Sequence, residues 1–406
     1  MTATICSNKR WRILVIGVAA MLFAGIIYAW SILKVPFADD LGFSGQTLAL
    51  NFTLTMSFFC IGGVISGGIV RRIGTRITII LAGFLAGSGL VLAGLIGYKD
   101  PLFLYLTYAL TSGFGIGMAY IVIISTVNAW FPDKKGLSSG ALMMGFGAST
   151  LILGNLAAKL FTSSLGWKNT YVLIGAAIGI AIVISSFFIY PPQKNEPLPA
   201  LNKKSSAHQT GFEQHDYKPI EMLRRFTFWR AFLALICITA VGNSIISFAR
   251  DLALSVEIKA TVATTLVGIL AICNGLGRIL TGVIFDTFGR RFTMIAANIL
   301  TIIAATVMLL SVALSLPILC IIGLCITGLS YGTSPTVCST FILTFYGKKH
   351  FATNLGIANF NLMGASIIAT VCTTLQVNNQ TYVTPCILLL VLSLFALGLN
   401  LSIKRP

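Results

Sequence analysis

An arginine lies deep within one of the apolar stretches of this sequence. Residues 260–285 are mainly apolar and are long enough to cross about 30 Å of hydrocarbon as a helix. Arg278 precedes Asp286, where the charged end of this stretch begins, by eight residues, or about 12 Å along a helix axis. This depth is close to the centre of a bilayer. Asn274 lies one helical turn away on the same face, so an amide stands beside the guanidinium.

The depth of Arg278 predicts an anion-binding site. A charge at mid-bilayer costs at least about 2.5–3.5 kcal/mol, and such residues usually face an aqueous cavity or a partner. All 11 carboxylates fall in predicted loops or near helix ends, so no acid of the chain is expected beside Arg278. A guanidinium can hold an incoming carboxylate through two parallel hydrogen bonds. The alternative is a structural role, in which Arg278 joins helices through backbone carbonyls.

The composition predicts an all-α integral membrane protein. Hydrophobic residues make up 56% of the chain, charged residues 10%, and the mean hydropathy is +0.91, values that exclude a soluble globular protein. The apolar runs do not alternate as barrel strands do. They predict twelve transmembrane helices, at residues 11–33, 46–70, 77–97, 101–127, 136–160, 168–190, 228–250, 260–285, 292–312, 316–345, 351–373 and 382–403.

The sequence carries no pattern of an enzyme or of a metal site. The nine cysteines form no CxxC pair and mostly lie inside the apolar spans, so we expect them to be packing residues. We find no nucleophile–His–acid set, metal cluster or nucleotide-binding loop. Neither catalysis nor a cofactor is therefore expected.

The basic residues predict how the chain crosses the membrane. With a cytoplasmic N-terminus, 21 of the 28 Lys and Arg residues fall on the inner side and only 6 on the outer side. By the positive-inside rule, both termini are expected in the cytoplasm, and the protein is expected in the plasma membrane, which is the inner membrane of a bacterium. The net charge of +17 thus reflects topology, and a nucleic-acid partner is not implied.

The chain is predicted to consist of two six-helix halves, residues 1–190 and 228–406, joined by a cytoplasmic linker at 191–227. The segment around Gly74 repeats around Gly289 at an offset of 215, and two further pairs of segments match at offsets of 214 and 217. This duplication resembles the architecture of the major facilitator transporters, whose two halves rock around a central site.

Short motifs support this resemblance and narrow it. Gly282, Asp286, Gly289 and Arg290 match the loop motif of the superfamily, and its first copy retains Arg72 and Gly74. These residues are expected to act in gating, although Arg71 stands where the motif usually has Asp. The chain also resembles the oxalate:formate antiporter and monocarboxylate transporter branch, through residues 28–31, 130–136, 352–356 and the pair Asn274 and Arg278.

The branch resemblance implies a substrate site. It places Arg278 and Asn274 in the substrate cavity and adds Tyr120, which matches a tyrosine that reaches the carboxylate. Tyr331 and Tyr28 are further candidates, although simple helix packing is an alternative for each tyrosine. Oxalate carriers have a lysine in the eleventh span, and this chain instead has residues 356–364 without lysine, including Asn359 and Asn361, which could hydrogen-bond a hydroxyl or keto group.

These observations predict a secondary active transporter of a small organic anion. One fixed cation suits a monocarboxylate such as lactate, pyruvate or formate better than a dianion, whose second charge would be left uncompensated. Proton symport and exchange against another anion both remain open. We expect a monomer whose other partner is the lipid bilayer. Two alternatives are an amino acid or other small-metabolite transporter of the superfamily, and a non-transporting membrane sensor with the same fold.

Overall fold

The fold is entirely helical within the part of the chain that the computed structural model describes, namely residues 2–97, 99–133, 135–193, 196, 216–347 and 350–403. Helices suit a chain this apolar, because a helix pairs its own backbone N–H and C=O groups where no water is present. Most of the predicted linker, residues 197–215, lies outside the described residues.

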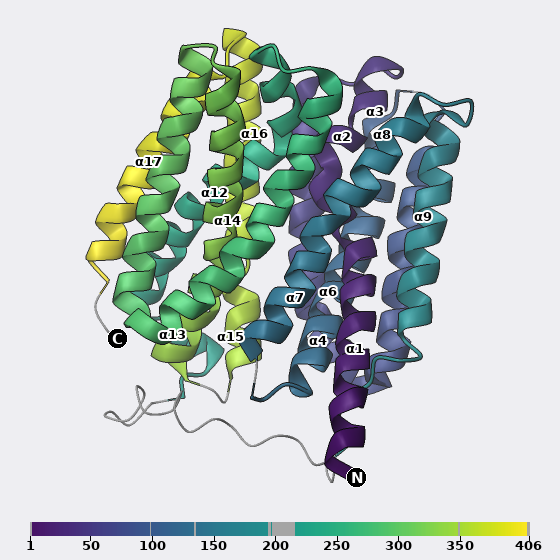
Figure 1. Ribbon diagram of the computed structural model, residues 1–406, viewed down its shortest axis with the longest axis vertical. Coiled ribbons are helices and arrows are strands. Elements are labelled where there is room, and N and C mark those ends of the chain that lie inside the picture. Colours follow the sequence, from purple (N-terminus) through teal and green to yellow (C-terminus); the bar gives the residue numbers. More distant parts are fainter. Residues whose placement is uncertain are drawn as a thin grey trace.

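The helices before residue 190 form one bundle, which we call the first bundle (Figure 1). They are α1 (Thr2–Ala24), the 3-10 helix η1 (Gly25–Ala29), α2 (Trp30–Leu33), α3 (Val35–Asp39), α4 (Gly45–Gly94), α5 (Pro101–Leu104), the π-helix η2 (Tyr105–Gly113), α6 (Phe114–Ala129), α7 (Lys135–Ser149), the π-helix η3 (Thr150–Gly154), α8 (Asn155–Phe161) and α9 (Gly166–Ser185).

The helices after residue 218 form the second bundle, which lies beside the first (Figure 1). They are α11 (Pro219–Leu223), α12 (Phe226–Ser255), α13 (Ala260–Ala313), α14 (Pro317–Tyr346), α15 (Phe351–Ala358), α16 (Asn361–Asn379) and α17 (Val383–Leu401). The beginning of α1 and the end of α17 point to the same end of the molecule, which we call the terminal end. The opposite end is the far end.

The membrane spans agree with those predicted from hydropathy. Within the described residues, 11 helical stretches are long and apolar enough to cross a membrane. One of them, Gly45–Gly94, has 50 residues and is divided by non-helical backbone at Gly74, so residues 45–73 and 75–94 are each long enough for one crossing. The twelve predicted spans are therefore all present as helices.

Two glycines turn the chain at equivalent places in the two bundles. Gly74 divides α4 with a φ of 80° and a ψ of 166°, and Gly289 divides α13 with a φ of 74° and a ψ of 179°. A Cβ atom is strained at these φ values, so glycine is the residue that fits. The two positions are separated by the same 215 residues as the sequence repeat. The repeated motif thus forms the same turn twice.

Several spans are irregular where the sequence predicted continuous helices. The first span changes to a 3-10 helix at Gly25–Ala29, and the fourth contains the π-helix Tyr105–Gly113. The eleventh span, predicted as one helix, is broken between α15 and α16 at residues 359–360. Such irregular turns often occur at functional positions, because they interrupt the regular helical hydrogen bonds and change the direction of the side chains.

Two pairs of helices make the most extensive contacts between the bundles. α7 lies against α13, and a Cβ atom on Gly147 would stand only 2.3 Å from the carbonyl oxygen of Ala271, so a larger residue would push the two helices apart. α4 lies against α16, where the Thr53 hydroxyl donates to the carbonyl oxygen of Ser366 at 2.7 Å.

An ion pair also joins the bundles near the far end. Nζ of Lys34, between α2 and α3, lies 2.6 Å from Oδ2 of Asp251 on α12. The same ammonium donates to the carbonyl oxygen of Ser247 at 3.3 Å. Lys34 directly follows the predicted span 11–33 and Asp251 directly follows the predicted span 228–250, and the structure brings these two span ends into contact.

Candidate functional site

Arg278 is buried between the two bundles. Its side chain projects from α13 and the residue is only 7% exposed. Nε donates to the amide oxygen of Asn274, one turn earlier, at 3.5 Å. Nη1 donates to the hydroxyl oxygen of Tyr120 on α6 at 3.3 Å and also to Sδ of Met143 on α7. We call these four residues the cationic cluster.

A close approach of α14 fixes the segment that carries Arg278. A Cβ atom on Gly332 would lie 2.1 Å from the carbonyl oxygen of Asn274 and 3.0 Å from the backbone nitrogen of Arg278. Only glycine fits here, so α14 packs directly on the backbone of α13. The Thr336 hydroxyl then donates to the carbonyl oxygen of Arg278 at 3.4 Å.

Two donors of the cationic cluster converge on one acceptor. The Tyr120 hydroxyl donates to Sδ of Met143 at 3.2 Å, and Nη1 of Arg278 donates to the same sulfur. A thioether is a weak acceptor, whereas a carboxylate oxygen accepts strongly from both a guanidinium and a hydroxyl. The Tyr120 hydroxyl and Nη1 of Arg278 therefore point to one position that suits an anionic oxygen. In this structure the sulfur of Met143 occupies that position.

A second group of polar residues, the tyrosine chain, crosses the middle of the molecule. The Tyr28 hydroxyl from η1 lies 3.4 Å from the Tyr331 hydroxyl from α14. The Tyr331 hydroxyl donates to the amide oxygen of Asn243 on α12 at 3.4 Å, and the Asn243 amide donates to the Ser366 hydroxyl on α16 at 2.7 Å. Four spans from both bundles thus meet through side-chain hydrogen bonds.

Aromatic rings connect the cationic cluster with the tyrosine chain. The ring of Phe146 lies edge-on to both Tyr28 and Tyr120, with 5.2 Å between ring centroids in each case. The ring of Phe59 lies 5.0 Å from that of Tyr120. The polar groups of Tyr28, Tyr120 and Arg278 are therefore bounded by an apolar wall on the first-bundle side.

Arg278 has no carboxylate partner in the described part of the chain. The ion pairs found there join Lys9 to Glu196, Arg10 to Asp133 and Lys34 to Asp251. A buried cation is costly without a counter-charge, and here neutral acceptors alone surround it. The electrostatics therefore favour the approach of an anion.

The structure brings together five of the seven predicted substrate residues. Arg278, Asn274 and Tyr120 share the cationic cluster, while Tyr28 and Tyr331 share the tyrosine chain. The two predicted asparagines lie elsewhere: Asn359 ends α15, where its carbonyl oxygen accepts from Cys60, and Asn361 is buried at the start of α16. Neither hydrogen-bonds to Arg278.

The predicted gating residues lie in the two repeated turns. Gly74 and Gly289 are the turn residues themselves, and a Cβ atom on Gly282 would meet nothing within 4 Å. Arg72 is exposed at the end of the first limb of α4. The side chains of Asp286 and Arg290 lie outside the described residues, so their gating role stays a prediction.

The sequence analysis missed five residues of this centre: Asn243, Ser366, Met143, Phe59 and Phe146. Asn243 carried the same signal as Asn274, an amide inside an apolar span, and a systematic search for such amides would have found it. Met143, Phe59 and Phe146 are apolar residues in apolar helices, and only the packing of the helices separates them from residues that face lipid.

Known proteins resemble this chain along most of its length. The oxalate:formate antiporter of Oxalobacter formigenes is 28% identical over 289 residues, which cover 71% of this chain and 66% of that protein. The uncharacterized MFS-type transporter YhjX of Escherichia coli is 25% identical over 365 residues, or 88% of this chain and 86% of that protein. Human monocarboxylate transporter 2 is 24% identical over 226 residues, 54% of this chain and 45% of that protein.

A solved structure shares the fold. The xylose transporter XylE from E. coli, in a partially occluded inward-open conformation, superposes with a TM-score of 0.71 over 96% of this chain and 97% of that chain, at 13% identity. The family sequence pattern of the Major Facilitator Superfamily matches residues 10–370 of this chain. The twelve-helix architecture predicted from hydropathy and repeats is thus confirmed, and this chain belongs to the Major Facilitator Superfamily, whose matching members are transporters and not enzymes.

Proposed function

We propose that this protein is a secondary active transporter that moves a small monocarboxylate, such as lactate, pyruvate or formate, by alternating access. The observation that carries this proposal is the geometry at Arg278. The guanidinium is buried at the junction of the bundles, and its Nη1 converges with the Tyr120 hydroxyl on a single acceptor position. A carboxylate in that position would neutralise the buried charge.

Charge balance supports a monoanion. One carboxylate beside Arg278 gives a neutral pair, whereas a dicarboxylate leaves a second charge among the neutral groups of the tyrosine chain. The relatives agree with this chemistry in part: one is named for oxalate and formate, and others are named for monocarboxylates. Formate and lactate are therefore the first substrates to test.

The surrounding side chains support a small substrate. Phe59 and Phe146 pack against the ring of Tyr120, so the space next to the guanidinium is bounded by rigid rings. Beyond them the hydroxyls of Tyr28 and Tyr331 provide donors for a hydroxyl or keto group. A short carbon chain between one charged end and one weakly polar end fits this arrangement.

The contacts between the bundles support alternating access around this centre. The Lys34–Asp251 ion pair joins the bundles near the far end, and breaking it is a requirement for opening there. We propose that the far end faces outward and the terminal end faces the cytoplasm of a cell whose plasma membrane holds the protein, as the positive-inside rule predicts. Transport is coupled either to a proton that travels with the carboxylate or to exchange against another anion.

The test combines binding and uptake. Purified protein is heated with a panel of C1–C4 monocarboxylates, dicarboxylates and amino acids, because a ligand that binds the folded state raises the melting temperature. The ligand that stabilises best is then used, labelled, for uptake into proteoliposomes. We expect a monocarboxylate to give the largest rise. A larger rise with an amino acid or a dicarboxylate would contradict the proposal.

Two matched variants make this test specific. Arg278→Lys retains the charge but loses the planar pair of donors, so we expect both the thermal shift and the uptake to disappear while the protein still folds. Arg10→Lys is the control, because Arg10 is equally buried, at 8% exposed, but is paired with Asp133 away from the site. Uptake at the wild-type rate by Arg278→Lys would overturn the anion site.

A further inference from the structure

A groove lies at the terminal end of the molecule. It runs along the last turns of α4 before the break at Gly74. Its volume is about 430 Å3, and it is lined by Ile65, Gly68, Ile69, Arg71 and Arg72. All five lining residues belong to α4, so the groove is open on its other sides. The lining combines two cations with an apolar floor, and none of these residues takes part in the cationic cluster or the tyrosine chain.

The groove opens on a partly exposed face of α4. The residues of this face recur at intervals of three or four and are all at least partly exposed. Six are apolar and the seventh is an arginine: Leu50, Leu54, Phe58, Ile61, Ile65, Ile69 and Arg72. Other faces of α4 are covered, since Cys60 contacts Asn359 and Gly62 packs against the backbone of Phe114. An exposed apolar stripe on a membrane helix meets acyl chains, and this one ends in an arginine.

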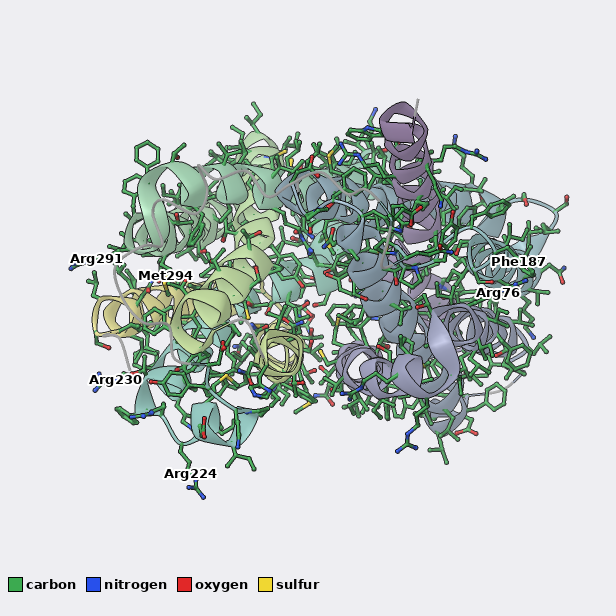
Figure 2. The ribbon with its side chains drawn as sticks, turned by 90° about the horizontal axis from the view of Figure 1, so that it is seen from below. Arg76, Phe187, Arg224, Arg230, Arg291 and Met294 are labelled. Carbon is green, nitrogen blue, oxygen red and sulfur yellow. The ribbon has the colours of Figure 1, made fainter. Side chains whose placement is uncertain are left out.

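The two guanidiniums of the groove have no partner in the described part of the chain. Arg71 and Arg72 are exposed and form neither an ion pair nor a contact with an aromatic ring. Some other arginines lie against an aromatic ring, namely Arg10, Arg76, Arg225 and Arg230. The guanidinium of Arg76 lies 4.2 Å from the centre of the Phe187 ring, and Figure 2 labels both residues at the edge of the first bundle. Guanidiniums without a partner are suited to hold an oxyanion, and both of these line the same groove.

We propose that this groove binds one anionic phospholipid of the leaflet at the terminal end. The phosphate lies between Arg71 and Arg72, and an acyl chain runs along Ile69 and Ile65 toward the bilayer centre. A basic pocket beside transmembrane helices is suited to such a headgroup. A zwitterionic lipid fits less well, because its own cation faces the two arginines.

The proposed site belongs to the first bundle alone. At the repeat offset of 215, Arg71 and Arg72 correspond to Asp286 and Thr287, which provide no cation. The substitution of Arg71 for the usual acid of the motif thus creates a pair of cations where the second copy has none. This inference is independent of the substrate that the transporter carries.

The experiment measures lipid binding to the purified, delipidated protein by native mass spectrometry. Phosphatidylglycerol and phosphatidylcholine with identical acyl chains are titrated separately. One molecule of phosphatidylglycerol is expected to bind more tightly than phosphatidylcholine. In the Arg71→Gln/Arg72→Gln variant this affinity should fall about 30-fold, since each basic side chain contributes about fivefold to the binding of an anionic lipid.

Two further variants separate the groove from general surface charge. Gly68→Leu retains both arginines and fills the groove: a Cβ atom on Gly68 meets nothing within 4 Å, and leucine favours a helix over glycine. It should lose the bound lipid. Arg12→Gln/Arg224→Gln removes the same charge from two other exposed arginines (Arg224 is labelled in Figure 2) and should retain it.

Three outcomes would overturn the proposal. The first is tight binding of phosphatidylglycerol by both Arg71→Gln/Arg72→Gln and Gly68→Leu. The second is an equal loss of binding in the Arg12→Gln/Arg224→Gln control, which would show diffuse attraction. The third is displacement of the lipid by inorganic phosphate at the concentration of the lipid, because an ion site needs no acyl chain.

Discussion

Arg278 and Met143 meet across the two bundles, with Nη1 of the arginine donating to Sδ of the methionine. α13 supplies the cation and α7 the thioether, and the Tyr120 hydroxyl of α6 donates to the same sulfur at 3.2 Å. The contact therefore joins the bundles and occupies the focus of the donors that we assign to a substrate carboxylate. A carboxylate and the thioether compete for these donors, so substrate entry requires that Met143 withdraw.

This competition predicts a gain of affinity in Met143→Leu. Leucine has a similar volume but accepts no hydrogen bond, so the two donors are free for a carboxylate. A hydrogen bond is worth about 0.5–1.5 kcal/mol net, which predicts monocarboxylate binding about 3–10 times tighter. The melting temperature without substrate should fall, because two buried donors lose their partner. Isothermal titration and thermal unfolding check both effects.

Met144→Leu is the control for this prediction. Met144 is the next residue of α7, is 36% exposed, and packs against Gly275, away from the guanidinium. Its replacement should leave the affinity unchanged. Weaker binding by Met143→Leu would mean that the thioether supports the bound substrate and does not compete with it.

The hydroxyl of Tyr120 predicts a graded loss of affinity. Tyr120→Phe retains the ring that packs against Phe59 and Phe146 but removes a donor to the carboxylate. Hydrogen bonds to charged groups are worth about 1.5–3 kcal/mol, so binding should weaken about 10–100-fold. Tyr28→Phe should cost less, because Tyr28 faces the Tyr331 hydroxyl and not the guanidinium. The dissociation constants of lactate for both variants test this order, and the reverse order would exchange the roles of the two tyrosines.

The centre of the site was predictable from the sequence because a mid-membrane charge is costly wherever it lies. Arg278 and Asn274 are visible as the polar interruption of one apolar run, and hydropathy alone marks them. The spans were predictable for the same reason: a bilayer imposes length and apolarity on each helix. Gly74 and Gly289 were predictable as a repeated motif, and both adopt a positive φ that explains their residue type.

The walls of the site were not predictable in this way. Met143 and Phe146 belong to the same apolar helix as residues that face lipid, and their residue types do not reveal which neighbour they meet. The break between α15 and α16 was not predicted either, and at this break the Asn359 carbonyl oxygen accepts from Cys60 while its amide oxygen accepts from Cys338. A residue near the middle of a predicted span can therefore contact other residues than a regular helix would bring next to it, when the helix is interrupted.

The ion pair at the far end predicts a charge-reversal result. Lys34→Gln should favour opening at the far end, since it removes an attraction between the bundles. The double variant Lys34→Asp/Asp251→Lys exchanges the two charges, re-forms the ion pair and should restore the closed state. A partly exposed pair contributes about 0.2–1 kcal/mol, so the population of the open state should change about 1.5–5-fold. Distances between spin labels at the far ends of α3 and α12 report this population. The prediction fails if the double variant behaves like Lys34→Gln.

The last prediction concerns substrate charge and uses the eleventh span. With Arg278 as the fixed cation of the site, oxalate should compete poorly against a labelled monocarboxylate. A lysine placed near the break between α15 and α16 would add the second cation that a dianion needs. The candidate positions are Leu362, whose carbonyl oxygen accepts from Ser366 of the tyrosine chain at 2.8 Å, and the buried Asn361.

Leu362→Lys should therefore raise the affinity for oxalate at least about tenfold and lower that for lactate, because an unpaired buried cation costs several kcal/mol without a second carboxylate. Asn361→Lys should act in the same direction. Gln376→Lys adds the same charge toward the far end of α16 and should change neither affinity. Competition by a carboxylate panel against labelled substrate, in the wild type and all three variants, measures the effect. If oxalate already outcompetes lactate and formate in the wild type, another cation reaches the cavity and the assignment to a monocarboxylate is wrong.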